Sequence, residues 1–189
     1  MAGLTVPKSM RRILVGGSAG SINQLKSLLG ELKPAATPPI VLLVHLSSMT
    51  SHDRMCEVVS EMLNYPCAVA QHGTRLEAGK IYMPQASYHL LVEPVSNVCQ
   101  FYDDDAYCFA KPSIDLLFSS CVGPEAAYTL AVLLSGANDD GATGLAGLHT
   151  AGALCAVADP DLSVFPKMPL SALERQPGLR VLNPVRLTN

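Results

Sequence analysis

The chain has 189 residues, a 49% hydrophobic fraction and a formal net charge of −3. This length and apolar content are typical of one domain with a sizeable buried core, so we expect a single domain over residues 1–189. The small negative charge provides no basic field, which excludes nucleic acid as an expected partner. The most apolar stretches, such as residues 40–46 and 128–134, fall far short of the roughly 20 residues that cross a bilayer, so we expect no membrane insertion.

The N-terminus and the cysteines both bear on the compartment. Residues 1–12 hold no apolar core of the signal-peptide kind, so we expect a cytoplasmic protein. The six cysteines show no C-x-x-C spacing that would bind zinc, and a chain of this size in a reducing compartment needs no disulfide for stability. We therefore expect free thiols at Cys56, Cys67, Cys99, Cys108, Cys121 and Cys155.

The first part of the chain alternates between strand and helix patterns. Residues 11–17 and 40–46 are apolar runs typical of buried parallel strands, and residues 21–32 between them carry leucines at helical spacing. A second helical pattern over residues 52–64 and a short strand over residues 67–71 follow. This order predicts repeated βα units.

The middle of the chain has a different pattern. Short apolar segments over residues 80–83, 89–93 and 99–102 are separated by turn residues, which predicts antiparallel hairpins inserted beside the sheet. The alternation then resumes as helix, strand, helix, strand and short helix over residues 112–122, 128–135, 141–150, 153–158 and 170–175.

These elements together predict an α/β fold, with a doubly wound, mostly parallel sheet, helices on both faces and a small antiparallel hairpin insertion. Sheets of this kind place their functional sites at the carboxyl ends of the strands. Reactive side chains that directly follow a predicted strand are therefore the candidates for a site. Three such places occur in this sequence.

The first place is Gly16 to Gly20, which matches the nucleophile-elbow pattern G-x-S-x-G at a strand-to-helix junction. Small neighbours permit a sharp turn that would expose the hydroxyl of Ser18 at the start of the next helix, where backbone N–H groups can hold an oxyanion. A plain Gly/Ser turn without chemical function explains the same motif.

The second place is His45, the penultimate residue of the strand predicted over residues 40–46. If this strand neighbours the strand over residues 11–17, their ends lie about 5 Å apart, which would bring His45 within reach of Ser18. A core histidine bonded to a backbone carbonyl is the alternative.

The third place is the pair Asp139 and Asp140, which follows the strand predicted over residues 128–135. An aspartate before Gly141 can act as an ordinary helix N-cap. Together with Ser18 and His45, however, a carboxylate here would complete a nucleophile, a base and an orienting group. The residues alone leave both interpretations open.

At this point the sequence resembles the CheB-type protein-glutamate methylesterases of bacterial chemotaxis, over nearly its whole length. The resemblance rests on six segments that match in order: Ile13 to Gly20, Leu43 to His45, Leu76 to Pro84, Lys111 to Asp115, Leu134 to Ala142, and Met168-Pro169. In that family the serine of the first segment is the nucleophile, the histidine of the second is the general base, and the aspartate before Gly-Ala orients the histidine. The resemblance therefore assigns a catalytic triad to Ser18, His45 and Asp140.

The resemblance implies hydrolysis of glutamyl γ-methyl esters on the cytoplasmic helices of chemoreceptors, with release of methanol and with glutamine deamidation as a second activity. This chemistry requires no metal and no organic cofactor. Most members of the family carry an N-terminal phospho-receiver domain, whereas here the first predicted strand begins about ten residues after Met1. We therefore expect no such domain in this chain, with a separate receiver-domain protein as the candidate regulator.

Three departures from the family pattern lie beside the predicted triad. Leu46-Ser47 follows the histidine where the family usually has a proline two places on, Ala19 to Ser21 replaces the commoner Thr-Gly-Gly, and Ala137-Asn138 stands where Met-Gly is typical. We expect an altered rim around the site. The other histidines, which are predicted to contribute far less than His45, are His52, His72, His89 and His149.

Other classes of protein fit the sequence less well. An ordinary α/β-hydrolase shares the elbow, but it places its acidic residue before the histidine and several strands before the nucleophile. A dinucleotide-binding module would need G-x-G-x-x-G after the first strand and an acidic residue where His45 stands. A catalytically weakened family member that serves as a binding or scaffold protein is the third alternative, which the altered rim permits.

Overall fold

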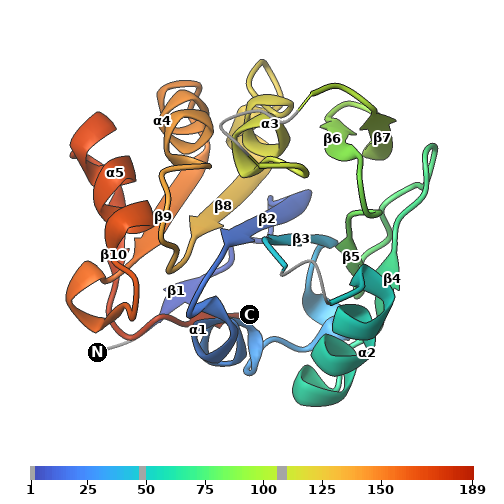
Figure 1. Ribbon diagram of the computed structural model, residues 1–189, viewed down its shortest axis with the longest axis horizontal. Coiled ribbons are helices and arrows are strands. Elements are labelled where there is room, and N and C mark those ends of the chain that lie inside the picture. The colour runs from blue at the N-terminus through green and yellow to red at the C-terminus, as the bar shows by residue number, and fades with distance from the viewer. Residues whose placement is uncertain (1–2, 47–49, 106–109) are drawn as a thin grey trace.

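The computed structural model describes residues 3–46, 50–105 and 110–189. Seven strands form one central sheet in which every pairing is parallel (Figure 1). In sheet order they are β10 (Arg180–Leu182), β9 (Leu154–Ala158), β8 (Thr129–Leu133), β2 (Arg12–Gly17), β3 (Ile40–Val44), β5 (Ile81–Met83) and β4 (Cys67–Val69).

Helices cover both faces of this sheet. One face carries α3 (Ile114–Ser119), α4 (Ala142–Thr150) and α5 (Lys167–Arg175), and the other carries α1 (Ser21–Leu29) and α2 (His52–Leu63) (Figure 1). The predicted doubly wound α/β fold is therefore confirmed.

Successive side chains of the central strand β2 supply both halves of the core. Leu14 packs with the α3, α4 and α5 side, whereas Ile13 and Val15 pack with the α1 and α2 side. All three side chains are fully buried, because successive residues of a strand point to opposite faces and both faces of this strand are covered. This double burial explains why the strand is apolar throughout rather than alternating.

The path of the chain fixes where a site can form. From β2 the chain crosses to β3 on one side, and only later returns to place β8 on the other side of β2. The carboxyl ends of β3, β2 and β8 therefore surround the point where the winding direction changes, which is where open α/β sheets bind their ligands.

The antiparallel hairpin insertion is confirmed, but its predicted extent is wrong. Among the described strands, only β6 (His89–Glu93) and β7 (Val98–Tyr102) pair antiparallel, and an isolated antiparallel bridge joins Arg75 to Val98. By contrast, β5 is a parallel strand of the central sheet between β3 and β4. All three residues of β5 are buried. A run this short has no readable periodicity, so the sequence could not reveal which sheet it joins.

The C-terminal region is more regular than predicted. Helix α5 begins at Lys167 rather than near Leu170, because Pro169 falls in the first turn, where proline is tolerated. The predicted tail contributes β10 to the central sheet and β11 (Leu187–Thr188) to a two-stranded parallel pair with β1 (Leu4–Thr5). Three short 3-10 turns complete the described elements: η1 (Pro34–Ala36), η2 (Ala126–Tyr128) and η3 (Pro160–Leu162).

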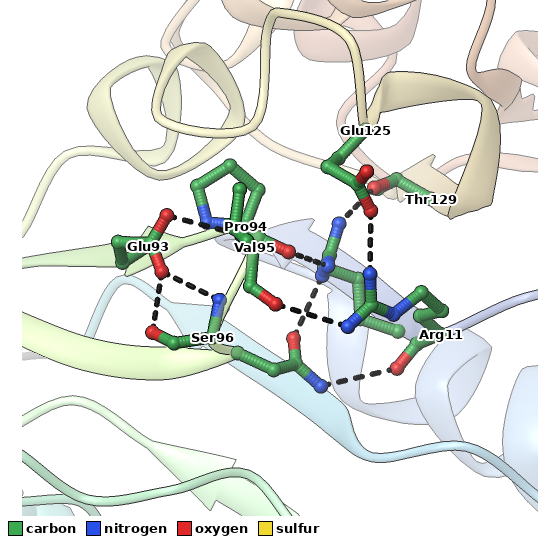
Figure 2. Close-up of polar contacts among 9 residues, drawn as sticks. Arg11, Glu93, Pro94, Val95, Ser96, Glu125 and Thr129 are labelled. Carbon is green, nitrogen blue, oxygen red and sulfur yellow. Dashed lines mark hydrogen bonds and ion pairs between the residues drawn. The ribbon is translucent and has the colours of Figure 1, made fainter.

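A polar cluster fastens the hairpin turn to the amino ends of the central strands. Arg12 has no exposed surface, and its guanidinium donates to Asn97 Oδ1 (2.8 Å), Thr129 Oγ1 (2.9 Å) and the carbonyl of Pro94. The neighbouring Arg11 reaches Glu125 and the carbonyl of Val95 (Figure 2). Inside the turn, Glu93 accepts from both the backbone and the hydroxyl of Ser96 (Figure 2).

Across the stretches 3–46, 50–105 and 110–189, none of the helices has the length and apolar character needed to cross a bilayer.

Candidate active site

Ser18 lies in the turn between β2 and α1. Its backbone N–H donates to the carbonyl of Ser135 (2.9 Å), and its own carbonyl accepts from the N–H of Ser21 (3.1 Å). Gly20 has a φ of 78°, a left-handed conformation that favours glycine, and an added Cβ there would lie 2.9 Å from Val164. The predicted sharp turn is therefore present, and Ser18 sits half-buried at the carboxyl end of the central strand.

His45 directly follows β3 rather than lying inside it as predicted, because the strand ends at Val44. Its backbone N–H donates to the carbonyl of Gly17 (3.0 Å), which extends the β2–β3 ladder to the residue before Ser18. Its ring Nε2 lies 2.8 Å from Asp140 Oδ2. Because an ionised carboxylate only accepts, Nε2 carries the hydrogen of this contact, and in the neutral form of the ring Nδ1 carries the lone pair.

Asp140 follows β8 and is 1% exposed. Besides His45, it accepts hydrogen bonds from the Ser113 hydroxyl (2.9 Å) and from the backbone N–H groups of Ile114 (2.8 Å) and Asp115 (2.9 Å). Each carboxylate oxygen thus receives two hydrogen bonds, which uses the roughly four acceptor sites that a carboxylate offers. The next residue, Gly141, has a φ of 91° that permits the tight entry into α4.

The pKa of Asp140 is set by two opposing effects. Burial is the largest single effect and by itself raises the pKa. The hydrogen bonds from His45, from the N–H groups of Asp115 and Ile114 and from Ser113 together outweigh it, so the net pKa lies below the ordinary value for aspartate. Asp140 is therefore an ionised carboxylate that holds the Nε2–H of His45.

Two carboxylates bridge α3 and α4 in opposite directions. Asp140, which precedes α4, accepts from the first N–H groups of α3, while Asp115 in the first turn of α3 accepts from the N–H of Gly144 (2.7 Å) in α4. Each satisfies donors that a helix start leaves unpaired. Burial raises the pKa of Asp115, and the nearby charge of Asp140 raises it further.

Two residues that support Asp140 were not identified from the sequence. Ser113 caps α3 and donates to Asp140, and its backbone N–H donates to Nδ1 of the fully buried His89 (3.1 Å). The Nε2 of His89 lies 3.0 Å from the carbonyl of Asp105. Ser113 lies in the matched segment Lys111 to Asp115, but a hydroxyl next to a proline gives no pattern that predicts this role.

Ser18 and His45 line one cavity of about 520 Å³. Lys111, Asn138 and His52 lie on its other walls. Nε2 of His52 is buried without a hydrogen-bond partner in the described part of the chain, and burial lowers the pKa of this ring. His52 thus lies in the cavity wall, a position that its sequence context did not predict.

Asp139 and Asp140 point to different surroundings. Asp139 is half-exposed and pairs with Arg175 (3.0 Å), whereas Asp140 turns inward to His45. Of the two aspartates, the structure thus brings the predicted one, Asp140, to the histidine. Its part in catalysis remains a prediction.

Among the described residues, two of the altered positions, Leu46 and Asn138, line this cavity. Ala137 is exposed, and the carbonyl of Ala19 accepts from the Ser135 hydroxyl (2.9 Å). Ser47, where the family pattern also differs, lies outside the described residues.

Comparisons with known proteins identify the family of this chain. The family model described as CheB methylesterase matches residues 13–189. A relative from Leptospira interrogans is 32% identical over 162 residues, which cover 86% of this chain and 83% of the relative. The protein named protein-glutamate methylesterase/protein-glutamine glutaminase 3 of Hahella chejuensis is 31% identical over 179 residues, which cover 93% of this chain and 50% of that protein.

The fold comparison points the same way. The crystal structure of the Thermotoga maritima CheB methylesterase catalytic domain superimposes with a TM-score of 0.81 at 19% identity, and the match covers 95% of this chain and 93% of that one. The chain spans about half the length of the Hahella relative and most of the Leptospira relative. The resemblance expected from the sequence is confirmed, and the chain belongs to the CheB methylesterase family.

Proposed function

We propose that this protein hydrolyses the γ-methyl esters of glutamate side chains in chemoreceptors, with Ser18, His45 and Asp140 as its catalytic triad. The observation that carries the proposal is the 2.8 Å contact between His45 and the buried Asp140, with Ser18 on the wall of the same cavity. These are the base, the orienting carboxylate and the nucleophile of a serine hydrolase. The substrate class follows from the family and from the names of its relatives.

The first half of the reaction forms an acyl enzyme. Nδ1 of His45 takes the proton of the Ser18 hydroxyl while Oγ attacks the ester carbonyl, and Asp140 stabilises the imidazolium that results. Collapse of the tetrahedral intermediate breaks the bond to the methoxy oxygen, which takes the proton from His45 and leaves as methanol.

The second half regenerates the enzyme. Water gives a proton to His45 and attacks the glutamyl ester of Ser18, and glutamate leaves as the serine recovers its proton. A glutamine side chain would react along the same path with ammonia as the leaving group. No step calls for a metal or an organic cofactor.

The oxyanion of the tetrahedral intermediate needs hydrogen-bond donors at the turn that carries Ser18. The N–H of Ser18 is already engaged with Ser135. Within the described residues, the N–H groups of Ala19 and Gly20 donate to no protein group, and the donor that directly follows the nucleophile is the usual one in an elbow. We assign the oxyanion contact to Ala19.

The surface beside the turn suits a protein substrate. Leu162, Val164 and Phe165 are 60%, 70% and 42% exposed, and the last two lie against Gly20. Phe165 is anchored in this apolar rim, because its N–H donates to the Ser135 hydroxyl (3.0 Å) and its carbonyl accepts from the N–H of Gly136 (3.0 Å). A fixed apolar surface next to the nucleophile fits the apolar face of an amphipathic receptor helix in the cytoplasm.

A separate receiver-domain protein is the regulator that we propose.

Methanol release from methylated receptor fragments tests the reaction. The wild type should release methanol, and Ser18→Ala should keep its fold but lose activity by about 10⁴, since removal of the nucleophile leaves only binding and oxyanion contacts. A folded Ser18→Ala protein that retains most of the activity would rule out this nucleophile. A wild type that cleaves small esters but releases no methanol would rule out the substrate class.

The apolar rim formed by Leu162, Val164 and Phe165 can be tested against a control residue, Val95, in the hairpin turn at the opposite end of the central strands. Val164→Ser combined with Phe165→Ser should lower kcat/KM on a methylated receptor fragment about tenfold and leave a small ester unaffected, which corresponds to about 1.4 kcal/mol of lost contact. Val95→Ser should change neither rate, because Val95 is equally apolar and 66% exposed but lies in the distant hairpin turn. Equal losses on both substrates would assign the rim to fold maintenance instead.

A further inference from the structure

Two cysteines meet at the edge of the sheet, away from the proposed triad. Cys56 lies within α2 and Cys67 begins the edge strand β4, and their sulfur atoms are 2.7 Å apart. A disulfide joins its sulfurs at about 2.05 Å, so the fold already holds this pair within about 0.7 Å of bonding distance. We infer that Cys56 and Cys67 form a redox-active pair that closes reversibly to a disulfide between α2 and β4.

The pair is open to a small oxidant. Cys67 is only half-buried, and both cysteines line a surface cavity of about 330 Å³ whose walls include Asp53 and Glu57. Burial is the main cause that raises the pKa of both thiols, so few thiolates are present at neutral pH and the reaction should be slow rather than catalytic.

The remaining described cysteines lack this arrangement. Cys99, Cys121 and Cys155 are buried, and none of them has a second sulfur as a hydrogen-bond partner among the described residues. Burial raises the pKa of Cys99 and of Cys155 to about 12. They provide internal controls for selectivity.

The oxidation balances with a peroxide as the oxidant. The thiolate of one cysteine attacks a peroxide oxygen, the O–O bond breaks, and a sulfenic acid and water form after proton transfer. The second sulfur then attacks the sulfenic sulfur, the S–S bond forms, the S–O bond breaks and a second water leaves. Two thiols lose two electrons to one peroxide, and a dithiol reductant reverses the change.

A disulfide here would restrain the wall of the cavity that holds Ser18. Cys56 lies one helical turn after His52, which begins α2 and lines that cavity. The bond would close a short loop through Tyr65 and Pro66 and tie the helix to the sheet edge. Because the sulfurs are already close, oxidation should raise the thermal midpoint of unfolding rather than strain the fold.

Peptide mapping of the folded wild type after treatment with hydrogen peroxide tests the pair. We expect one disulfide link between the peptides of Cys56 and Cys67 that persists when free thiols are blocked by alkylation, the loss of two alkylatable thiols, a higher melting temperature and full recovery with dithiothreitol. Thiol loss that maps to Cys108, which lies outside the described residues, or to single over-oxidised cysteines without this link would overturn the inference. A lower melting temperature of the linked form would overturn the claim that the fold accommodates the bond.

Matched serine variants sharpen the assignment. Cys67→Ser should abolish the link, whereas Cys155→Ser should keep it, because Cys155 sits in β9 away from the pair. If Cys67→Ser fails to fold, the wild-type peptide map still decides the question. A link that survives Cys67→Ser would show that Cys56 pairs with another cysteine.

Discussion

Asp140 and Arg12 are both buried charges, and they lie at opposite ends of the central strands. Asp140 follows the carboxyl end of β8, whereas Arg12 opens β2 at its amino end. Asp140 is surrounded by N–H and O–H donors, and Arg12 by a carbonyl, an amide oxygen and a hydroxyl. Within the described part of the chain, Arg12 has no carboxylate at ion-pair distance.

The two clusters differ in whether a titratable side chain connects the buried charge to a cavity. Asp140 bonds to the ring of His45, whose side chain is 16% exposed and lines the cavity that Ser18 also lines. The hydrogen bonds of Arg12 instead join the hairpin turn to the sheet, through Asn97, Pro94 and Thr129. Burial of a charge therefore does not identify a functional site; an adjacent titratable group that borders a cavity does.

Asp140→Asn should produce the largest effect and should act on the rate. An amide keeps the shape, but it cannot stabilise the imidazolium of His45 and can select the wrong tautomer, a change that costs about 10⁴ in kcat in serine proteases with such a triad. Steady-state hydrolysis of a small ester measures the loss.

The adjacent aspartate supplies the control for this variant. Asp139→Asn removes only a surface ion pair with Arg175, so its activity should stay within about twofold of the wild type. A large loss from Asp139→Asn with a mild effect of Asp140→Asn would move the third member of the triad by one residue and break the comparison.

Arg12→Met should act on stability and leave the rate unchanged. Methionine fills much of the volume, but Asn97, Thr129 and the carbonyl of Pro94 lose a charged donor inside the fold. We expect the free energy of unfolding to fall by about 3 kcal/mol, because partners left unpaired in a buried cluster are costly. Urea denaturation and small-ester kinetics on the folded variant separate the two readouts, and a loss of kcat would show that this cluster also shapes the site.

Most of the fold could be predicted from the sequence because its core elements are long and strongly patterned. The apolar runs of β2, β3 and β8 and the leucine spacing of α1 identify buried strands and a surface helix by period alone. The three residues of β5 and the C-terminal strands carry no such signal, since their place depends on partners distant in the sequence.

The candidate site divides in the same way. Ser18, His45 and the pair Asp139 and Asp140 each follow a recognisable strand, so a rule about strand ends made them candidates, and the family resemblance then selected Asp140. The support of Asp140 by Ser113 and His89 depends on how the hairpin and α3 pack together, which no local pattern encodes. From the sequence, His89 was expected to contribute far less to activity than His45. Because His89 accepts from the N–H of Ser113, its replacement can lower activity through Ser113 without His89 being a second base.

Ser113→Ala should affect both stability and rate, and both moderately. The hydroxyl caps α3 and donates a charge-assisted hydrogen bond to Asp140, so we expect unfolding to become easier by about 2 kcal/mol. If the transition state loses about 1.4 kcal/mol of stabilisation relative to the folded free enzyme, kcat/KM falls about tenfold. Ser120→Ala, at the far end of the same helix, should lower stability without changing kcat. Similar rate losses in both variants would place the effect in the helix rather than in the contact with Asp140.

The smallest expected effect is a change in acid stability. The pKa of Asp140 is lowered in the folded protein, so its contribution is fully present above the unfolded value of about 3.9 and disappears as the pH falls through the folded pKa. Asp115 has a raised pKa and the opposite sign, because its protonation on acidification relieves a buried charge and adds stability. The two contributions therefore oppose each other within one pair of helices.

Asp140→Asn should separate these two contributions. The variant loses the stabilisation that acid removes, so its free energy of unfolding should fall less steeply than that of the wild type below about pH 4. It also loses one cause of the raised pKa of Asp115, which acts in the opposite sense because it reduces the stability that Asp115 gains on protonation. Arg12→Met provides the matched control, since it also removes a buried charge and lowers stability but leaves Asp140 and Asp115 in place. Its free energy of unfolding should therefore decrease with acidification in parallel with that of the wild type. Urea denaturation at several pH values measures the slopes. If the free energy of unfolding decreases with the same slope in the wild type and in Asp140→Asn, Asp140 is not held as an anion in the folded protein. Asp140 would then not differ from Arg12 as a charge that serves the site rather than the fold.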